Sequence, residues 1–211
     1  MTSLVFDATA LSHFARAGRM DELRTAVADD EPVLLAEVAA ELARGVPGYP
    51  ALGSAAAGGW LKQVELEDLP ELAAFARYKG ELGGGPERNN GEAAVLAWVS
   101  VNGGVTVIDE VAARAIGARE RLQVHGSLWL LIRSFKSCVH DRVTVEAIVD
   151  DLRSRLGIIR RPVRSRRWSG RTESAVYYWA GTYRHRNAPA GRQRRGPFRL
   201  GLRSRDPSVA R

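Results

Sequence analysis

The sequence predicts a three-layer α/β/α domain with a central parallel sheet. Short apolar runs typical of buried strands alternate along the chain with segments of helical periodicity, starting at residues 2–6 and 10–17. Such alternation is typical of a parallel sheet with helices on both faces. A chain of 211 residues with 45% hydrophobic residues is large and apolar enough for one domain with a sizeable core. We therefore predict one domain at residues 1–159 and a separate segment at 160–211.

Each element is predicted from its own local pattern. Gly18 and Gly45 follow helical segments and are suited to end them. The clearest strand is 105–108, where four apolar or β-branched residues follow a Gly-Gly turn. Asn90 is a candidate N-cap for the helix that carries Glu92 in its first turn. In chain order we expect a strand at 2–6, helices at 10–17 and 20–28, a brief strand and a helix within 33–45, a strand at 60–66, helices at 70–79 and 91–101, strands at 105–108 and 123–125 with a helix at 110–118 between them, and closing helices at 127–136 and 144–156.

Charge divides the chain at about residue 160. The segment 160–211 contains 15 arginines and two acids, a net charge of +13, whereas residues 1–159 contain 16 basic and 22 acidic side chains, a net charge of −6. The segment shows neither helical nor strand periodicity and is rich in Arg, Gly, Pro and Ser, so we expect a disordered basic tail. Two origins fit this tail: an arm that contacts phosphates, or translation of a shifted reading frame in a GC-rich gene.

Cysteine content and the first residues indicate a cytoplasmic protein. Cys138 is the single cysteine, which excludes an intramolecular disulfide framework and is typical of a reducing compartment. No basic segment followed by an apolar stretch opens the chain, so no signal peptide is expected. Because no apolar run approaches the ~18 residues needed to cross a bilayer, no membrane association is expected.

Four acidic side chains lie where strand-like runs end or on the helices that follow them. They are Asp7, Glu41, Glu92 and Asp109. Ligands of open α/β sheets collect outside the carboxyl ends of the strands, so we expect these acids to share one pocket. Clustered carboxylates repel one another unless a cation is present, and hard oxygen ligands favour Mg²⁺ or Mn²⁺. The pattern therefore predicts a divalent-metal site for phosphodiester chemistry.

The shared pocket carries two measurable expectations. The carboxyl oxygens of Asp7, Glu92 and Asp109 should lie within roughly 4–8 Å of one another, with Glu41 slightly further away. Removing one charge, as in Asp109→Asn, should raise the melting temperature of the metal-free protein, because it relieves repulsion. Simpler interpretations exist for three of these acids. Asp7 could only cap the following helix, Glu92 could be only a favourable first-turn charge, and Glu41 could be an ordinary surface residue of its helix.

Two of the positions have a neighbouring rival. Glu37 lies four residues before Glu41 on the same helical face and competes with it for a place in the pocket. Glu110 follows Asp109 directly. One of this second pair is expected at the metal site and the other at a solvated helix start.

Five segments between residues 3 and 135 form a recognisable set: FDATALSHFARAGRMDEL, PVLLAEVAAELARG, GEAAVLAW, VIDEVAARAIG and VHGSLWLL. Together they resemble a PIN domain, in the VapC-like branch of toxin ribonucleases and predicted nucleic-acid-binding proteins. The resemblance implies a PIN-like fold and a metal-dependent endoribonuclease, the toxin of a toxin–antitoxin pair. It also implies RNA as the substrate, a cognate antitoxin as partner and a homodimer as the assembly.

The family's four acids fall on the four carboxylates already singled out. The resemblance implies that Asp7, Glu41, Glu92 and Asp109 are the catalytic residues. Mg²⁺ or Mn²⁺ would be held by Asp7, Glu92 and Asp109 in particular.

Three further residues are candidates for supporting roles. Thr9 is expected to orient Asp7 by hydrogen bonding, and Glu110 to support the acid beside it. Arg88 lies in the glycine-rich loop before the Glu92 helix and is a candidate phosphate contact.

A second function remains open at the level of sequence. Relatives often have another acid two residues after the third one, where this chain has Ala94, and they tend to close with a compact helical segment instead of an Arg-rich one. These departures favour a non-catalytic PIN-like module that binds nucleic acid or a partner without cleaving.

Overall fold

The computed structural model describes residues 1–53 and 59–156 of the chain. Predictions for residues 160–211, including the disordered tail and the domain boundary, lie outside this part and stay predictions. The described residues form the strands β1 (Ser3–Phe6), β2 (Glu31–Leu35), β3 (Lys62–Val64), β4 (Val105–Val107) and β5 (Gln123–His125), and the helices α1 (Ala8–Ala17), α2 (Met20–Ala26), α3 (Ala36–Gly45), α5 (Leu69–Leu82), α6 (Asn90–Asn102), α7 (Val111–Arg119), α8 (Ser127–Lys136) and α9 (Arg142–Leu156).

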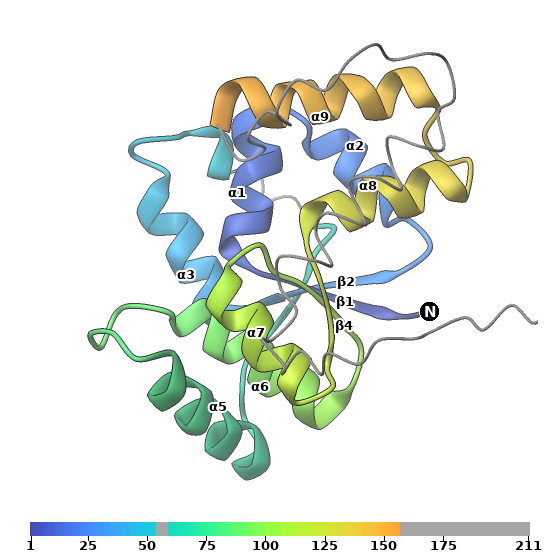
Figure 1. Cartoon of the computed structure of the whole chain (residues 1–211). Coiled ribbons are helices and arrows are strands. Elements are labelled where there is room, and N and C mark those ends of the chain that lie inside the picture. Colours follow the sequence, from blue (N-terminus) through green and yellow to red (C-terminus); the bar gives the residue numbers. More distant parts are fainter. Residues whose placement is uncertain (54–58, 157–211) are drawn as a thin grey trace, which may run out of the picture. The chain divides into compact units, whose positions relative to one another are not determined.

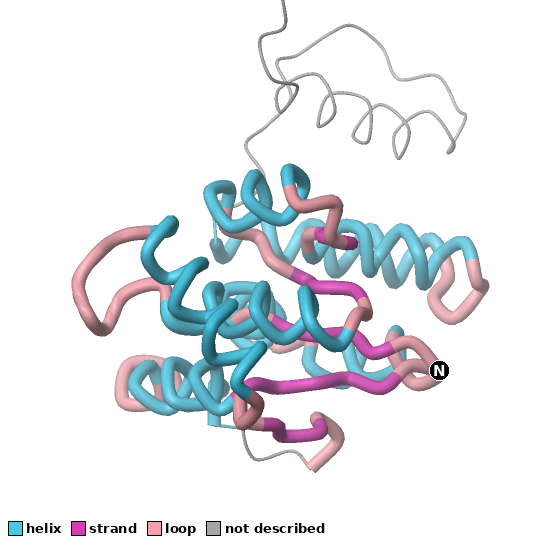
Figure 2. The backbone as a smooth tube through the Cα atoms, turned by 90° about the horizontal axis from the view of Figure 1, so that it is seen from below, coloured by secondary structure: helices cyan, strands magenta, loops and turns pink. Residues whose placement is uncertain are grey.

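The five strands form one sheet in the order β3-β2-β1-β4-β5, and every neighbouring pair is parallel. Figure 2 shows the strands running side by side through the middle of the domain. In the central register, Phe6 of β1 pairs with Leu34 on one side and with Val107 on the other. All carboxyl ends therefore meet at one edge of the sheet.

Helices cover both faces of this sheet. One layer contains α1, α2, α8 and α9, and the other contains α5, α6 and α7, while α3 packs against helices of both layers, α1 and α6 (Figure 1). This arrangement confirms the predicted three-layer α/β/α class. No helix among residues 1–53 and 59–156 is both long and apolar enough to cross a membrane.

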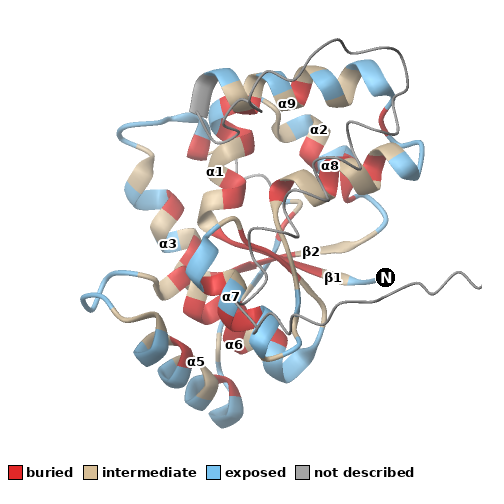
Figure 3. Cartoon of the chain, in the orientation of Figure 1, coloured by how far each residue is buried: buried red, intermediate tan, exposed pale blue. Residues whose placement is uncertain are grey.

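The core is continuous from the strands into the inner faces of the helices (Figure 3). The side chains of Leu4, Val5 and Phe6 in β1 are fully buried. Helix α6 is buried on nearly all sides, since residues 93–97 show no exposed surface, and it packs on β1, β2 and β4 as well as on three helices. A helix that is apolar all round belongs in the interior, and this placement brings the first turn of α6 to the carboxyl edge of the sheet.

Element boundaries differ from the sequence-based prediction where side-chain contacts decide them. The strand expected at 60–66 is shortened to β3, Lys62–Val64. Helix α5 begins at Leu69, because Glu71 accepts a hydrogen bond from the backbone N–H of Asp68. It extends to Leu82, beyond the predicted end at residue 79. Asn90 is the first residue of α6 and not its cap; the cap position belongs to Asn89, whose φ is 58°.

Candidate metal site

The acidic site lies where the strand order of the sheet reverses. Strand β1 lies between β2 and β4, and the helices that leave β1 and β4, namely α1 and α7, cover opposite faces (Figure 1). A crevice opens at such a switch point, outside the carboxyl ends of the strands. The first residue after β1 is Asp7, and its backbone N–H donates to Val107 O of β4 at 3.1 Å.

Asp7 is both a helix cap and a buried charge. Its Oδ2 accepts the backbone N–H of Thr9 at 3.0 Å, which caps α1. The residue has no exposed surface, and its Oδ1 is buried without a hydrogen-bond partner. Burial and the nearby charge of Glu92 raise the pKa of Asp7 to about 7, with a smaller contribution from Glu41, while hydrogen bonds from Thr9 work in the opposite direction. Capping and membership of the acidic site, which the sequence offered as alternatives, occur together.

Glu92 comes close to Asp7 from the first turn of α6. It is partly buried, and its Oε2 is buried without a hydrogen-bond partner. Burial raises the pKa of Glu92, and the charges of Glu41 and Glu110 raise it further, while a hydrogen bond from its own backbone N–H and, to a smaller degree, the charge of Lys79 lower it. Both Glu92 and Asp7 thus resist ionisation while no cation is near.

Glu41 is the third member, held in place by the backbone of α6. Its Oε1 accepts the N–H of Gly91 at 3.0 Å. A Cβ on Gly91 would lie only 2.8 Å from Glu41 Oε2, so the approach requires glycine at this position. Glu37, its rival in the sequence, also has a buried oxygen without a partner but does not join the group.

Asp7, Glu41 and Glu92 each offer a carboxylate oxygen that lies within 4.8 Å of the other two. We call these three residues the acidic cluster. It is the one group of three or more potential ligands found among the described residues. Asp7 and Glu92 each have one buried oxygen without a hydrogen-bond partner, and burying an unpaired polar atom is costly. A donor set made only of carboxylate oxygens fits a hard divalent cation such as Mg²⁺ or Mn²⁺.

Asp109 follows β4 after Ile108 but is not part of the acidic cluster. Its Oδ1 accepts the backbone N–H of Ser127 at 2.8 Å, and its Oδ2 accepts the Ser127 hydroxyl at 2.6 Å and His13 Nδ1 at 2.8 Å. Burial alone would raise the pKa of Asp109, but the hydrogen bonds from His13 and Ser127 outweigh it and leave the pKa below its ordinary value. We call Asp109, His13 and Ser127 the Asp109 network.

This arrangement bears on two expectations drawn from the sequence. Within 4.8 Å the group joins Glu41, and not Asp109, to Asp7 and Glu92, and the wider span of roughly 4–8 Å expected between Asp109 and the other acids stays a prediction. The expected gain in stability from Asp109→Asn assumed repulsion among the acids, whereas Asp109 is surrounded by hydrogen-bond donors. We therefore expect Asp109→Asn to lower, and not to raise, the melting temperature of the metal-free protein.

The remaining predicted residues lie around the acidic cluster. Thr9 donates its backbone N–H to Asp7. Glu110 is exposed at the start of α7, close enough for its charge to raise the pKa of Glu92. Arg88 is exposed in the loop before α6, where its carbonyl oxygen accepts a hydrogen bond from Lys79.

Sequence reasoning missed His13, Ser127 and the steric role of Gly91. His13 lies on α1 and Ser127 at the start of α8, and no spacing relates either of them to Asp109. A weak signal exists for Ser127, because it is a hydroxyl residue at a strand-to-helix junction, where such residues commonly bond to exposed backbone or acidic groups.

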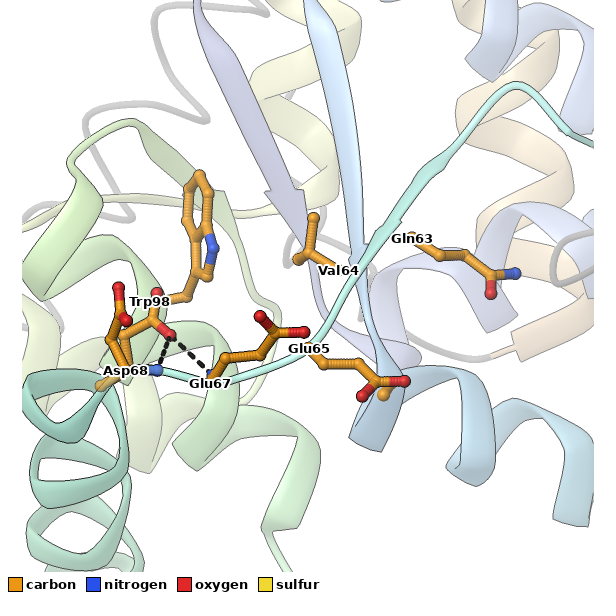
Figure 4. A pocket seen from close by; sticks show the side chains of 8 residues that line it. Gln63, Val64, Glu65, Glu67, Asp68 and Trp98 are labelled. Atoms are coloured by element: carbon orange, nitrogen blue, oxygen red, sulfur yellow. Dashed lines mark hydrogen bonds between the residues drawn. The ribbon is translucent and has the colours of Figure 1, made fainter.

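A cavity of about 500 Å³ lies apart from the acidic cluster and has its own acidic lining. Figure 4 shows Trp98 and Val64 on its wall with Glu65, Glu67 and Asp68 around them. None of the acidic-cluster residues lines it. The side chain of Glu71, which also lines it, is already occupied by the backbone N–H groups of Glu67 and Asp68 and by Asn102. Glu65, Glu67 and Asp68 are exposed, and none of them belongs to the acidic cluster.

Comparison with known proteins identifies one family. A family model described as a PIN domain matches residues 3–165. No curated protein and no solved structure gives a significant match. The matched range spans the whole sheet, both helical layers and every residue of the acidic cluster.

Proposed function

Because the chain belongs to the PIN domain family, we propose that it is a metal-dependent endoribonuclease whose acidic cluster holds Mg²⁺ or Mn²⁺. The observation that carries this proposal is the convergence of three carboxylate oxygens within 4.8 Å of one another, two of the residues having a buried oxygen without a protein partner. Like charges held this close are costly unless a cation binds between them.

The protein's own contribution is to hold these oxygens in place before substrate arrives. The cap bond from Thr9 fixes the Asp7 carboxylate, and the N–H of Gly91 fixes that of Glu41. When bound, a divalent ion supplies Lewis-acid stabilisation of charge on the phosphodiester and an activated water for in-line attack. Burial of Asp7 excludes water from one side of the site and strengthens every electrostatic interaction within it.

RNA is the proposed substrate, on the strength of the resemblance to VapC-like toxins. The proposal includes the remaining features of that group: a cognate antitoxin as partner, a homodimer as assembly and a cytoplasmic location. Arg88 is the proposed phosphate contact, because it is exposed on the loop that leads into the Glu92 helix.

Ala94 is one of the two departures that favour the non-catalytic alternative, and its position on α6 bears on that argument. Ala94 is fully buried, and it lies two residues after Glu92 on α6, so the two side chains leave the helix in different directions. An acid at this position would not point where Glu92 points. The absence of an acid there therefore leaves the acidic cluster intact.

RNA cleavage with purified protein tests the proposed activity. Single-stranded RNA should be cleaved in Mn²⁺ and preserved in excess chelator, and Asp7→Asn should lower the rate by about two orders of magnitude or more, because it removes a charged oxygen from the ion. Equal RNA decay with wild type and Asp7→Asn would show that the cleavage comes from a contaminant and would remove the enzyme assignment.

Glu67→Gln is the matched control for that experiment. It also removes one carboxylate charge, but from the exposed lining of the separate 500 Å³ cavity. Its cleavage rate should equal that of wild type. A loss as large as that of Asp7→Asn would mean that overall acidity, and not the acidic cluster, matters for cleavage.

A further inference from the structure

The four candidate acids divide into two kinds according to how their oxygens are used. In the acidic cluster, Asp7 Oδ1 and Glu92 Oε2 are buried and accept nothing from the protein. In the Asp109 network, both oxygens of Asp109 accept hydrogen bonds, one on Oδ1 and two on Oδ2. If Asp109 coordinated an ion, the ion would have to displace one of these hydrogen bonds or bind to an oxygen that already accepts one.

The Asp109 network also joins three separate elements of the fold. Asp109 extends from the end of β4, Ser127 opens α8, and His13 lies in the middle of α1. Ile108 N donates to His125 O at 2.8 Å, which holds the end of β4 beside the end of β5. The Asp109 carboxylate accepts the backbone N–H of Ser127, the first residue of α8. The N-terminus of a helix favours a negative charge at this place.

Packing around Asp109 leaves little freedom for its carboxylate to turn. A Cβ on Gly126 would lie 2.7 Å from Asp109 Oδ1 and 3.3 Å from a guanidinium nitrogen of Arg114. Burial lowers the pKa of Arg114, and the charge of Asp109 works in the opposite direction. Donors and a cation thus surround Asp109, whereas other acids surround Asp7.

We infer that this chain holds a single divalent ion with three carboxylates, Asp7, Glu41 and Glu92, and that Asp109 is a structural carboxylate that bonds α1 and α8 to the sheet instead of a ligand. The inference rests on the proposed function for the presence of the ion. It departs from the four-acid arrangement that the family resemblance implies, and the use of the Asp109 oxygens is the reason.

Mn²⁺ binding to the full chain tests the inference without reference to activity. Calorimetric titration of wild type should give one ion per chain. Asp109→Asn should keep that stoichiometry and the electron paramagnetic resonance line shape of bound Mn²⁺, because no ligand oxygen changes. Glu92→Gln should weaken Mn²⁺ binding by at least about tenfold, because it removes one ligand charge.

Melting temperatures complete the test. Asp109→Asn and Ser127→Ala should each melt below wild type. The first removes the partly buried charge that His13 and Ser127 bond, and the second removes one donor to that charge. Ser127→Thr keeps both donors and should recover most of the loss. Titration should be done well below the lowest of these melting temperatures, so that every variant is folded when Mn²⁺ is added.

The outcomes separate the inference from the proposed function. Two ions per wild-type chain, or loss of one ion or a changed line shape in Asp109→Asn, would overturn the single-ion site. If wild type binds no Mn²⁺, the proposed function fails, while the melting temperatures of Asp109→Asn and Ser127→Thr still report whether Asp109 is structural. An Asp109→Asn protein as stable as wild type would overturn that role.

Discussion

Asp7 and Asp109 follow neighbouring parallel strands at the same edge of the sheet, yet their surroundings are opposite. Asp7 meets the charges of Glu92 and Glu41, and its pKa is raised to about 7. Asp109 meets donors from His13 and Ser127, and its pKa is lowered. Both are extensively shielded from solvent, so burial alone does not separate them. What separates them is the chemistry that the neighbouring helices deliver, acids from α3 and α6 in one case and donors from α1 and α8 in the other.

The comparison predicts that the two carboxylates contribute to stability with opposite signs. Asp109→Ala should lower the free energy of unfolding of the metal-free protein by about 3–5 kcal/mol, because it removes three hydrogen bonds to a charge and leaves His13 and Ser127 without their acceptor. Urea denaturation measures the difference, in a buffer whose pH is above the pKa of about 7 of Asp7 so that both carboxylates are ionised. A loss below about 1 kcal/mol would place Asp109 among ordinary surface charges.

Asp7→Asn should have the opposite effect in the same buffer. With a pKa of about 7 in the folded protein, ionised Asp7 is held in a place that disfavours its charge, so the neutral amide should raise the free energy of unfolding by roughly 2–4 kcal/mol above pH 7. Added Mn²⁺ should stabilise wild type but not this variant. Equal losses of unfolding free energy in Asp7→Asn and Asp109→Ala, both without metal, would contradict the predicted difference between the two carboxylates.

The pH dependence of stability should show the two carboxylates separately. The folded pKa of Asp7 is raised from 3.8 to about 7, so the folded state binds its proton more tightly, and this contribution to stability should fall as the pH rises from about 4 to 7. The folded pKa of Asp109 is lowered from 3.8, so its contribution is present above about pH 4 and is lost as the pH falls through the lower folded value. Asp7→Asn should reduce the first limb to the part that comes from Glu92, whose pKa is also raised, and should leave the second limb unchanged. Saturating Mn²⁺ should remove the first limb because it displaces the protons.

Two glycine substitutions offer a matched pair that changes no charge. Gly91→Ala places a methyl group 2.8 Å from Glu41 Oε2 and should weaken Mn²⁺ binding by about tenfold, because Glu41 must move. Gly126→Ala places a methyl group 2.7 Å from Asp109 Oδ1 and should lower the melting temperature without changing Mn²⁺ affinity. Calorimetry and thermal unfolding of both proteins decide the matter, and a tenfold affinity loss in Gly126→Ala would connect Asp109 to the ion.

Substitution of Arg88 has the smallest expected effect, and it tests whether the loop before α6 contacts RNA. Arg88→Ala should weaken binding of non-cleavable RNA a few-fold and reduce the slope of log affinity against log salt by about 0.7, since one phosphate contact is lost from a single strand. Arg24→Ala, which removes an exposed arginine from α2, is the control and should leave both values unchanged. Identical slopes for wild type and Arg88→Ala would remove Arg88 from the binding surface.

Much of the fold could be predicted from the local pattern of apolar residues. The spans expected for the last strand and the helix after it, 123–125 and 127–136, are those of β5 and α8. Errors are concentrated where side chains from other elements act on an end, as with Asn89 at the start of α6, whose amide bonds the carbonyls of Leu82 and Gly83 instead of capping its own helix. Such contacts leave no trace in the spacing of apolar residues.

The sequence by itself determined the alternation of strands and helices, and with it a parallel sheet whose carboxyl ends carry acids. These features follow from apolar periodicity and from chain connectivity, which act over a few residues at a time. Placement of Asp7 needed nothing more, since it directly follows a buried strand that the sequence marks clearly.

Only the tertiary structure decided which acids share a site and which does not. Glu41 joins the acidic cluster because the N–H of Gly91, 50 residues away, holds its carboxylate. Asp109 lies outside that cluster and accepts hydrogen bonds from His13, 96 residues away, and from Ser127. Contacts between residues this far apart depend on how packed helices are placed against the sheet, and a buried carboxylate takes its character from whichever charge or donor that packing brings to it.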